Sequence, residues 1–371
     1  MKFRNKRPFI AVILGTRPEV IKLSVLIRQL RKHRASYFLL HAGQHYSYPM
    51  DRLFFKELEL PDPKYRLSVH QSPATGHGHH VGRMLPLIET ILLKECPRAV
   101  LVQGDTNTVL AGALAASKIP EIDLGHVEAG LRSRDRSMPE EINRILTDHV
   151  SDYLFAPTKG SQRTLEQEGL DPGKIFVTGN TIVDAVRENL ALARKKLGAL
   201  PFGVSRKRGF FLLTLHRQEN VDDRGRLASI LQGLEEVSRK LRMPILFPAH
   251  PRTVKMLKTF HISPPADVRV LPPFGFLDFL RLEADARLIL TDSGGVQEEA
   301  CILRVPCVTL RTSTERPETV AAGANVIAGY RPGDILRCAR DMMERDRRWE
   351  NPFGDGRASQ RILRILERRL S

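Results

Sequence analysis

Short apolar runs alternate along the chain with stretches in which apolar residues recur every three or four positions. The first run is Phe9–Leu14, and the stretch after it repeats at helical spacing, at Val20, Leu23, Ile27 and Leu30. Further runs predict strands at residues 37–41, 99–103, 122–127, 153–156, 175–178, 210–215, 245–248, 268–271, 288–291, 307–310 and 326–328. These runs are continuously apolar rather than alternating, which is typical of parallel sheets covered by helices on both faces. The pattern predicts an α/β protein.

The strands fall into two series, separated by a basic segment at residues 190–208 that contains glycine and proline. We therefore expect two doubly wound parallel-sheet domains facing each other across a cleft, with ligands at the carboxyl ends of the strands. The first domain is expected at residues 1–188 and the second at 189–355. The stretch 359–370 predicts an amphipathic helix that packs back on the first domain, to which we assign residues 356–371.

The composition agrees with this division. The chain has 371 residues, 42% of them apolar and 27% charged, as in ordinary globular proteins with two domains. Its apolar runs are all far shorter than the ~20 residues that span a bilayer, so we expect no membrane partner. A basic N-terminus precedes the run Phe9–Leu14, as in a signal peptide, but six apolar residues followed by Gly-Thr-Arg-Pro-Glu favour a core strand and a cytoplasmic protein. The four scattered cysteines indicate reduced, mostly buried thiols.

The net charge of +16 raises the alternative of a nucleic-acid-binding protein. The lysines and arginines are spread along predicted helices, and no basic motif interleaved with aromatic residues is found in the sequence. We therefore expect charged helix faces and no nucleic-acid partner, and the RNA-binding alternative rests on charge alone. A second alternative is a metal site at the histidine-rich segment 77–80. Its glycine and its distance from acidic residues favour a flexible loop, so we expect no metal.

A Ser293-Gly294-Gly295 turn lies between the predicted strand at 288–291 and a helix expected to begin near Val296. Two glycines at such a turn let backbone N–H groups approach a phosphate, and the helix N-terminus adds partial positive charge. Glu299 lies about one turn into this helix, where a carboxylate could reach a ribose hydroxyl. An ordinary helix cap would explain the turn by itself. A matching set of polar strand ends in the first half of the chain favours a nucleotide diphosphate site.

The first strand ends in Gly-Thr-Arg-Pro-Glu, where Arg17 offers bidentate contacts to an anion and Lys22 a point charge. Asp105, Glu128 and Glu140 follow later strands, so the sequence predicts three carboxylates on one rim. Each of them alone is explained as a helix-capping acid. Together, like charges raise one another's pKa values, which allows an acid and a base to coexist at neutral pH.

Basic and histidine side chains follow the strands of the second half, at His216, His250, Arg311 and Arg316. They predict a cationic, nucleotide-binding half. The sequence has no Gly-x-Gly-x-x-Gly after its first strand and no Gly-x-x-x-x-Gly-Lys-Ser/Thr. A dinucleotide cofactor and a P-loop NTPase are therefore not expected.

Ordered motifs across nearly the whole chain support this interpretation: GTRPEVIKL, GQH, GDT, HVEAGLRS, PEEINR, LHRQEN, TDSGGVQEEA and TERPE. In this order they resemble the non-hydrolysing UDP-N-acetylglucosamine 2-epimerases, whose fold is of the two-domain GT-B class. The resemblance implies interconversion of UDP-GlcNAc and UDP-ManNAc, through elimination of UDP to 2-acetamidoglucal and re-addition. It implies no cofactor and no metal, a UDP-sugar substrate and a homodimer.

The resemblance also implies roles for individual residues. Chemical steps are assigned to Asp105, Glu128 and Glu140, with His216 beside the diphosphate. Substrate binding is assigned to Arg17, Lys22, His250, Phe279, Ser293, Gly294, Gly295, Glu299 and Arg316. Of these, Phe279 matches the family's uracil-pocket aromatic, and a core phenylalanine is the alternative. The stretches 46–49 and 71–74 depart from the bacterial pattern that is tied to activation by a second UDP-GlcNAc.

Alternatives within the superfamily are a hydrolysing 2-epimerase, which releases free ManNAc, and an epimerase acting on a modified UDP-sugar. Gly-Leu-Arg at residues 130–132, where the modified-sugar enzymes often have Gly-Asn-Arg, favours plain UDP-GlcNAc. A retaining glycosyltransferase of the same fold is a further alternative, against which the three rim carboxylates argue.

Overall fold

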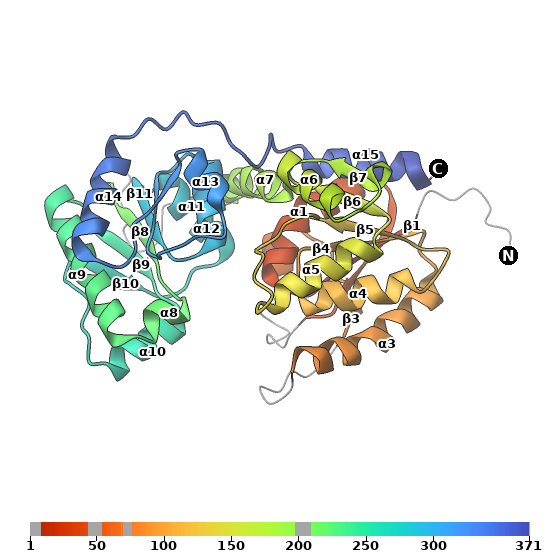
Figure 1. Ribbon diagram of the computed structural model, residues 1–371, viewed down its shortest axis with the longest axis horizontal. Coiled ribbons are helices and arrows are strands. Elements are labelled where there is room, and N and C mark those ends of the chain that lie inside the picture. Colours follow the sequence, from red (N-terminus) through yellow and green to blue (C-terminus); the bar gives the residue numbers. More distant parts are fainter. Residues whose placement is uncertain (1–8, 44–53, 68, 70–75, 197–208, 371) are drawn as a thin grey trace. The chain divides into compact units, whose positions relative to one another are not determined.

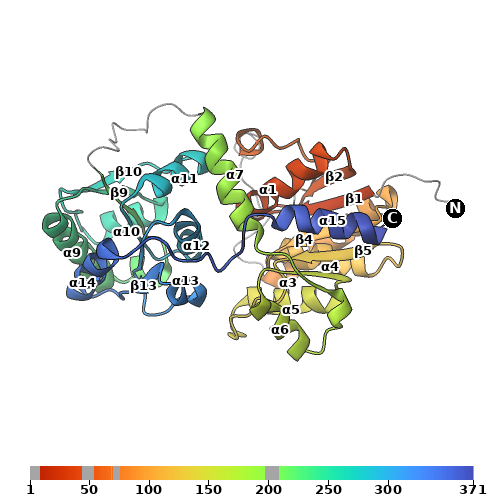
Figure 2. The ribbon, with the colours of Figure 1, turned by 90° about the horizontal axis from the view of Figure 1, so that it is seen from above.

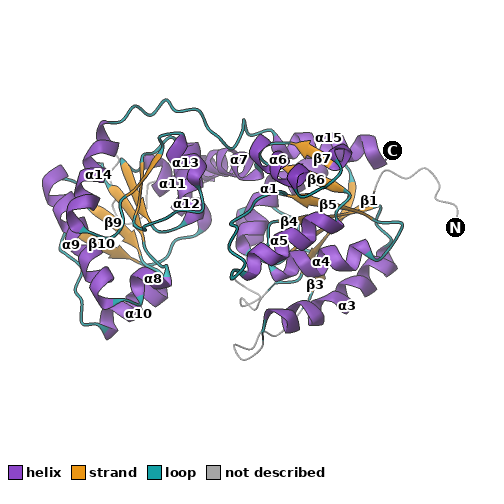
Figure 3. Cartoon of the chain, viewed as in Figure 1, coloured by secondary structure: helices purple, strands orange, loops and turns teal. Residues whose placement is uncertain are grey.

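The chain forms two compact units, one from residues 1–187 and 353–371 and the other from residues 188–352. The computed structural model describes residues 9–43, 54–67, 69, 76–196 and 209–370 (Figure 1). The motif residues Gln44 and His45 and the departing stretches 46–49 and 71–74 lie outside the described residues. Each unit is an independent α/β layer structure, in which helices cover both faces of a parallel sheet (Figure 3).

The first unit contains a seven-stranded sheet in the order β3-β2-β1-β4-β5-β6-β7, in which every pair is parallel. Its strands are β1 (Phe9–Leu14), β2 (Ser36–His41), β3 (Tyr65–Arg66), β4 (Ala99–Gln103), β5 (Asp123–Val127), β6 (Tyr153–Ala156) and β7 (Ile175–Val177). The strand order reverses between β1 and β4, and such a switch point is where open α/β sheets bind their ligands.

Helices of the first unit are α1 (Arg17–Lys32), α3 (His77–Glu95), α4 (Asn107–Ser117), α5 (Pro139–Val150), α6 (Lys159–Gln167) and α15 (Ala358–Leu370), with a 3₁₀ turn at Pro172–Lys174. Helix α7 (Thr181–Lys196) begins in the first unit and continues into the second. The C-terminal helix α15 packs against α1 (Figure 2). Its start is fixed by the buried Asp184, which accepts hydrogen bonds from the backbone N–H groups of Ala358 and Ser359 at 3.1 and 2.9 Å. The unit is therefore built from both ends of the chain.

One local prediction is wrong in this unit. The histidine-rich segment was expected to form a loop, but His77 begins helix α3. The reason is an apolar stripe at four-residue spacing, because His80, Met84, Ile88 and Leu92 are all buried. His80 is the first member of that stripe, so its burial extends the helix through the glycine-containing segment.

The second unit contains a six-stranded parallel sheet in the order β10-β9-β8-β11-β12-β13. Its strands are β8 (Phe211–Thr214), β9 (Ile245–Pro248), β10 (Val268–Leu271), β11 (Leu288–Thr291), β12 (Cys307–Thr309) and β13 (Asn325–Ile327). Its helices are α8 (Gln218–Val221), α9 (Arg224–Leu241), α10 (Pro251–Thr259), α11 (Phe276–Asp285), α12 (Gly294–Leu303), α13 (Pro317–Ala321) and α14 (Pro332–Glu344). Here the strand order reverses between β8 and β11.

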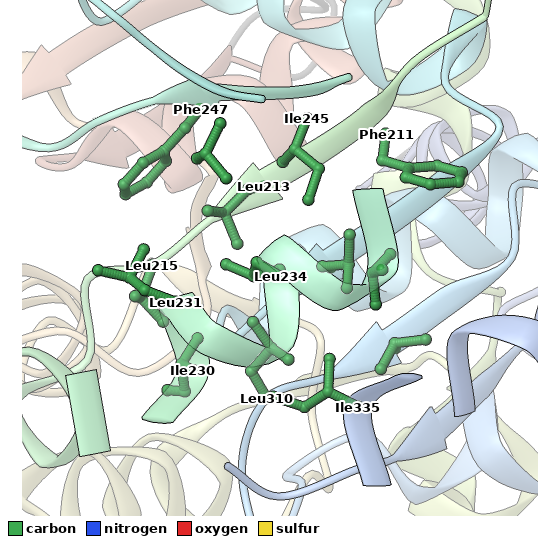
Figure 4. Packing of buried hydrophobic residues seen from close by; sticks show 14 of the residues in the cluster. Phe211, Leu213, Leu215, Ile230, Leu231, Leu234, Ile245, Phe247, Leu310 and Ile335 are labelled. Carbon is green, nitrogen blue, oxygen red and sulfur yellow. The ribbon is translucent and has the colours of Figure 1, made fainter. Parts of the chain in front are cut away.

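A continuous apolar core holds the second sheet against α9 and α14 (Figure 4). Fully buried residues of β8 and β9 meet Leu234 of α9 and Ile335 of α14. Gly233 lets the two helices approach, because a Cβ atom there would lie 2.9 Å from Ile335 Cδ1 and 3.0 Å from Pro332 Cα. Close packing of this kind holds the strand ends of the unit in fixed positions.

Cys301, Cys307 and Cys338 are buried and Cys96 is exposed, all as free thiols. Burial raises the pKa of the Cys301 thiol to about 12, so this group stays protonated and unreactive. Among the helices that the structure describes, none has the length and apolar character needed to cross a membrane. Within the same described ranges, no three side chains are grouped as a metal site would require.

Candidate functional site

A buried carboxylate joins two loops at the switch point of the first sheet. Glu19 accepts hydrogen bonds from the N–H of Gly15 at 2.6 Å and from the hydroxyl of Thr16 at 2.9 Å, both after β1. It also accepts one from the hydroxyl of Thr106, after β4, at 2.7 Å. Burial raises the pKa of Glu19 to about 6, although these hydrogen bonds oppose the rise. Glu19 therefore connects the first loop to the loop that bears Asp105.

The carboxylate of Glu128 is bound by three side chains that come from separate elements of the first unit. Lys22 Nζ of α1 lies 2.7 Å from both Oε1 and Oε2. Gln103, at the end of β4, donates to Oε2, and Asn180, after β7, donates to Oε1 at 3.1 Å. Glu128 has a φ of 74°, a left-handed conformation that disfavours side chains other than glycine. We infer that these three donors hold the residue there and fix the direction of its carboxylate.

Asp105 is held by helix α5. Its carboxylate accepts a hydrogen bond from Arg144 Nη2, and its backbone carbonyl accepts one from Asn143 Nδ2 at 2.9 Å. Arg144 Nη1 also donates to Glu141 at 2.9 Å. The Asp105 side chain remains 35% exposed, so it is positioned by α5 and still accessible to a ligand.

The two adjacent acids at the start of α5 differ in environment. Glu141 is buried and accepts hydrogen bonds from the N–H groups of Ser133 and Arg134 at 2.9 and 2.8 Å. Burial by itself would raise the pKa of Glu141, but these bonds and Arg144 hold it below its ordinary value. Glu140 is half-buried, and its side chain forms no hydrogen bond or ion pair with any residue that the structure describes. The two acids therefore differ in that the Glu141 carboxylate is held by several donors and the Glu140 carboxylate is not.

Arg17 stands at the start of α1 with an exposed side chain. Its guanidinium lies 5.7 Å from the centre of the Phe54 ring. The cation predicted alongside it, Lys22, is instead ion-paired with Glu128. Helix α1 thus supplies one cation, Lys22, to the Glu128 carboxylate and carries another, Arg17, at the surface.

In the second unit, a fully buried aspartate organises the switch point. Asp292, after β11, accepts hydrogen bonds from the N–H groups of His216 at 3.0 Å and Arg217 at 2.9 Å, both after β8. It accepts a third from Asn220 Nδ2 at 3.2 Å. The position of the His216 loop is therefore set by a residue that follows it by more than seventy positions.

His216 and His250 lie close together, because they follow the neighbouring strands β8 and β9. Their ring centres are 6.4 Å apart, and His250 Nδ1 accepts a hydrogen bond from the N–H of Arg252 at the start of α10. Burial lowers the pKa of His216, opposed by Asp292 and assisted by the nearby cations Arg217 and Arg311. A lowered pKa means that this ring is neutral at pH 7 and gains charge only in more acidic solution.

The Ser-Gly-Gly turn forms the start of α12, which begins at Gly294, two residues before the predicted start. The Ser293 side chain makes no capping hydrogen bond. Gly294 is packed beside an acid, because a Cβ atom there would lie 3.2 Å from Glu315 Oε2. Glu315 is ion-paired with Arg217 and Arg311, each at 3.2 Å. The helix N-terminus therefore adjoins a cluster of alternating charges.

Three further predicted ligands also lie in the second unit. Arg316 Nε is 2.7 Å from the buried Glu298. Phe279 is a half-buried residue of α11 that packs against an apolar cluster to which α12 contributes Val296 and Ala300. Glu299 is partly exposed and adjoins the fully buried Glu283. Burial, with Glu299 as a second cause, raises the pKa of Glu283 well above its ordinary value. The arrangement gives Glu299 a protonated neighbour.

Several residues that organise these sites were not among the predicted ligands: Glu19, Gln103, Arg144, Asn180 and Asp292. Each lies inside or directly beside a recognised motif, or follows a predicted strand. Their position as polar residues at strand ends is therefore the feature of the sequence that could have identified them as site residues. Sequence spacing alone could not show that Gln103 and Asn180 contact the same carboxylate.

Two doubly wound parallel-sheet units, each with polar side chains at the switch point of its sheet, define the GT-B-like class of α/β proteins. The family model of UDP-N-acetylglucosamine 2-epimerase matches residues 28–367, so the chain belongs to this family of isomerases. The predicted family, fold class and enzyme class are confirmed.

Similar proteins cover nearly the whole chain. UDP-N-acetylglucosamine 2-epimerase of Methanocaldococcus jannaschii is 53% identical over 363 residues, which is 96% of this chain and 98% of that protein. UDP-2,3-diacetamido-2,3-dideoxy-D-glucuronate 2-epimerase of Pseudomonas aeruginosa is 42% identical over 361 residues, covering 96% and 99%. The crystal structure of the M. jannaschii enzyme in complex with UDP-GlcNAc and UDP matches with a TM-score of 0.84 at 52% identity, covering 96% of this chain and 99% of that one.

Proposed function

We propose that this protein interconverts UDP-GlcNAc and UDP-ManNAc by inverting carbon 2 of the sugar without releasing free sugar. Membership of the epimerase family and the similarity to the M. jannaschii enzyme support the substrate. The observation that carries the proposal is the Glu128 carboxylate, held by Lys22, Gln103 and Asn180 at the carboxyl edge of the first sheet. Asp105 and Glu140 follow neighbouring strands of the same sheet.

The chemistry explains why carboxylates are needed. The hydrogen on carbon 2 is barely acidic, because that carbon is not next to a carbonyl. When UDP leaves carbon 1, positive charge develops on the ring and the hydrogen becomes labile. Carboxylates stabilise that charge and exchange the proton, while cations around the diphosphate stabilise the leaving group. Loss of the proton gives 2-acetamidoglucal, and re-addition of UDP with protonation from the opposite face inverts carbon 2.

We assign the chemical steps to Asp105, Glu128 and Glu140. Glu140 is half-buried without a partner among the described residues, which suits a group that gives and takes a proton. Glu128 is fixed in direction by its three donors, and Asp105 is held by Arg144 while still exposed. Arg17 and Lys22 are assigned to substrate binding and to the support of Glu128.

We assign the nucleotide to the second unit. The diphosphate is proposed to bind at the start of α12, with His216 beside it, and the ribose at Glu299. The further proposed ligands are His250, Phe279, Ser293, Gly294, Gly295 and Arg316. The free N–H groups and dipole of a helix N-terminus favour an anion at this position.

Amide substitutions test the assignment of the carboxylates. In Asp105→Asn, Glu128→Gln and Glu140→Gln, the turnover of UDP-GlcNAc is expected to fall at least about 100-fold, whereas the Kd for UDP changes little. Glu166→Gln, an exposed acid of α6 outside the site, is the matched control and should keep full activity. Wild-type turnover in all three amide variants would remove the assignment.

Product analysis separates the proposed reaction from its alternatives. A UDP-sugar product indicates epimerisation, free ManNAc indicates hydrolysis, and UDP release that depends on an acceptor indicates glycosyl transfer. Inversion of a modified UDP-sugar is the second candidate, which the similarity to the P. aeruginosa enzyme favours. Comparing kcat/KM for UDP-GlcNAc and the diacetamido-uronate decides between the two. The cytoplasmic location and the homodimer stay predictions, and sedimentation velocity tests the latter.

A further inference from the structure

A fully buried histidine–aspartate pair lies directly beneath the loops that bear Asp105 and Glu128. His126 is on β5 and Asp148 on α5, and both have no exposed surface. His126 Nδ1 is 2.6 Å from Asp148 Oδ1, and His126 Nε2 is 2.8 Å from the carbonyl oxygen of Gly104. Because a carbonyl cannot donate, Nε2–H is the donor to Gly104. On the other side of the ring, the Asp148 carboxylate is the acceptor for Nδ1.

The second oxygen of Asp148 binds the loop after β5. Asp148 Oδ2 accepts a hydrogen bond from the N–H of Gly130 at 3.1 Å and lies 2.7 Å from Arg132 Nη1. Arg132 in turn is bidentate to Glu168, at 2.8 and 2.6 Å. Burial would raise the pKa of Asp148, but His126 and Arg132 hold it below its ordinary value. Asp148 thus belongs to a hydrogen-bonded network that runs from the buried His126 through Arg132 to the partly exposed Glu168.

Both ends of the network stop one or two residues from a proposed catalytic carboxylate. Gly104 directly precedes Asp105, has a φ of +86° and donates its N–H to the carbonyl of Val127 at 3.2 Å. Gly130 follows Glu128 by two residues and has a φ of +81°. A Cβ atom at Gly130 would lie 2.4 Å from the carbonyl oxygen of Ser161, so this loop is also packed tightly. The backbone on both sides of the pair has little freedom.

Helix α5 contacts the Asp105 loop by three routes. Arg144 binds the carboxylate of Asp105, Asn143 binds its carbonyl, and Asp148 reaches the preceding peptide through His126. Hydrogen bonds at successive atoms of one loop set its orientation more narrowly than a single contact does.

We propose that His126 and Asp148 are positioning residues for the epimerisation, which fix the Asp105 loop and the Glu128 loop relative to each other. This inference rests on the proposed function of the two carboxylates. Neither residue is proposed to touch the substrate. Their contribution is to hold two reacting groups in place before the substrate binds, and displacement of a catalytic group by about 1 Å costs roughly 100-fold in rate.

Two substitutions of His126 separate the effects of its two hydrogen bonds, one with Asp148 and one with the Gly104 carbonyl. The amide nitrogen of His126→Gln can reach the position of Nε2 and still donate to Gly104. The shorter His126→Asn places its amide near Nδ1 and leaves the Gly104 carbonyl without a donor. We expect kcat to fall by about 5-fold in His126→Gln and by about 100-fold in His126→Asn, with KM changed less than about 3-fold in both.

Asp148→Asn and its matched control test the acid. Asp184 is also a buried aspartate of the first unit that accepts two backbone hydrogen bonds, but it serves the start of α15. We expect both Asp148→Asn and Asp184→Asn to lower the Tm, and only Asp148→Asn to lower kcat. If His126 and Asp148 served only the stability of the fold, Asp148→Asn and Asp184→Asn would have equal kcat when compared at the same loss of Tm. Equal kcat in His126→Gln and His126→Asn would likewise overturn the proposal.

Hydrogen–deuterium exchange provides a readout that does not depend on activity. In Asp148→Asn, we expect faster exchange in peptides that contain residues 103–109 and 125–135, and no change there in Asp184→Asn. Unchanged exchange of both peptides in Asp148→Asn would contradict the positioning role. If the wild-type protein exchanges as expected and yet fails to epimerise UDP-GlcNAc, the proposed function fails while the positioning of the loops stands.

Discussion

Lys22 Nζ lies 2.7 Å from each carboxylate oxygen of Glu128, although 106 positions separate the two residues in the chain. Their side chains are 14% and 4% exposed, so water screens this pair only weakly. The pairing joins α1 to the loop after β5. It also explains why a residue with left-handed backbone geometry, Glu128, sits at a fixed place on the rim.

Lys22→Met is expected to lower the free energy of unfolding by about 3 kcal/mol, because it leaves the Glu128 charge buried without its cation. The double variant Lys22→Met/Glu128→Gln removes that charge and should recover part of the loss. Urea unfolding of the single and double variants measures both effects. A double variant that is less stable than Lys22→Met would contradict an uncompensated charge as the cause.

The raised pKa of Glu19 is expected to make the free energy of unfolding of the protein depend on pH. Burial raises its pKa in the folded state to about 6, above the ordinary value of 4.5. Between these two pH values the unfolded chain has lost the proton and the folded protein keeps it, so stability falls as the pH rises through this window. The difference in unfolding free energy between wild type and Glu19→Gln should shrink by about 2 kcal/mol between pH 4 and pH 7. A difference that does not change with pH would show that Glu19 is not titrating abnormally.

The sequence predicted the parallel-sheet fold because the strands are continuously apolar and the helices are periodic. It missed β3 because Tyr65–Arg66 is too short to form a pattern. It placed the acids and cations of both units at strand ends, since motif positions follow directly from the strands. It did not show that Gln103, Asn180 and Lys22 meet at one carboxylate, because only the strand order of the folded sheet brings them together.

Buried polar residues were the harder part of the site to predict. His126 begins the motif HVEAGLRS, whereas Asp148 lies four residues after the end of PEEINR and belongs to no motif. Nothing in their spacing of twenty-two residues indicates contact. The glycine content of the histidine-rich segment favours a loop, but the buried stripe that begins at His80 makes the segment the start of α3. In both cases tertiary burial decided the outcome.

Glu315 adjoins the proposed phosphate site at the start of α12, and its negative charge opposes that of a diphosphate. We expect Glu315→Gln to bind UDP about 3–10-fold more tightly at low salt, with a smaller gain at high salt. Glu219→Gln is the matched control, because it also removes an acid from Arg311 but does not adjoin Gly294. Isothermal titration calorimetry measures both variants. Equal affinities in the two variants would argue against a diphosphate beside Glu315.

His216 should make UDP binding depend on pH. Its lowered pKa keeps the ring neutral at pH 7 in the free protein, and a diphosphate beside it would raise that pKa and favour protonation. Affinity for UDP is therefore expected to rise as the pH falls from 7.5 to 6, with uptake of a proton. His216→Gln should show a smaller rise, which separates the histidine from the titration of UDP itself. Identical pH profiles would remove His216 from the diphosphate site.

Proton exchange at carbon 2 without release of the sugar is measured by incubation with UDP-GlcNAc in deuterated water, followed by NMR of the products. We expect deuterium at carbon 2 in both UDP-GlcNAc and UDP-ManNAc, with the uridine diphosphate still attached. A UDP-ManNAc product that retains the original hydrogen at carbon 2, or no product at all, would contradict this expectation.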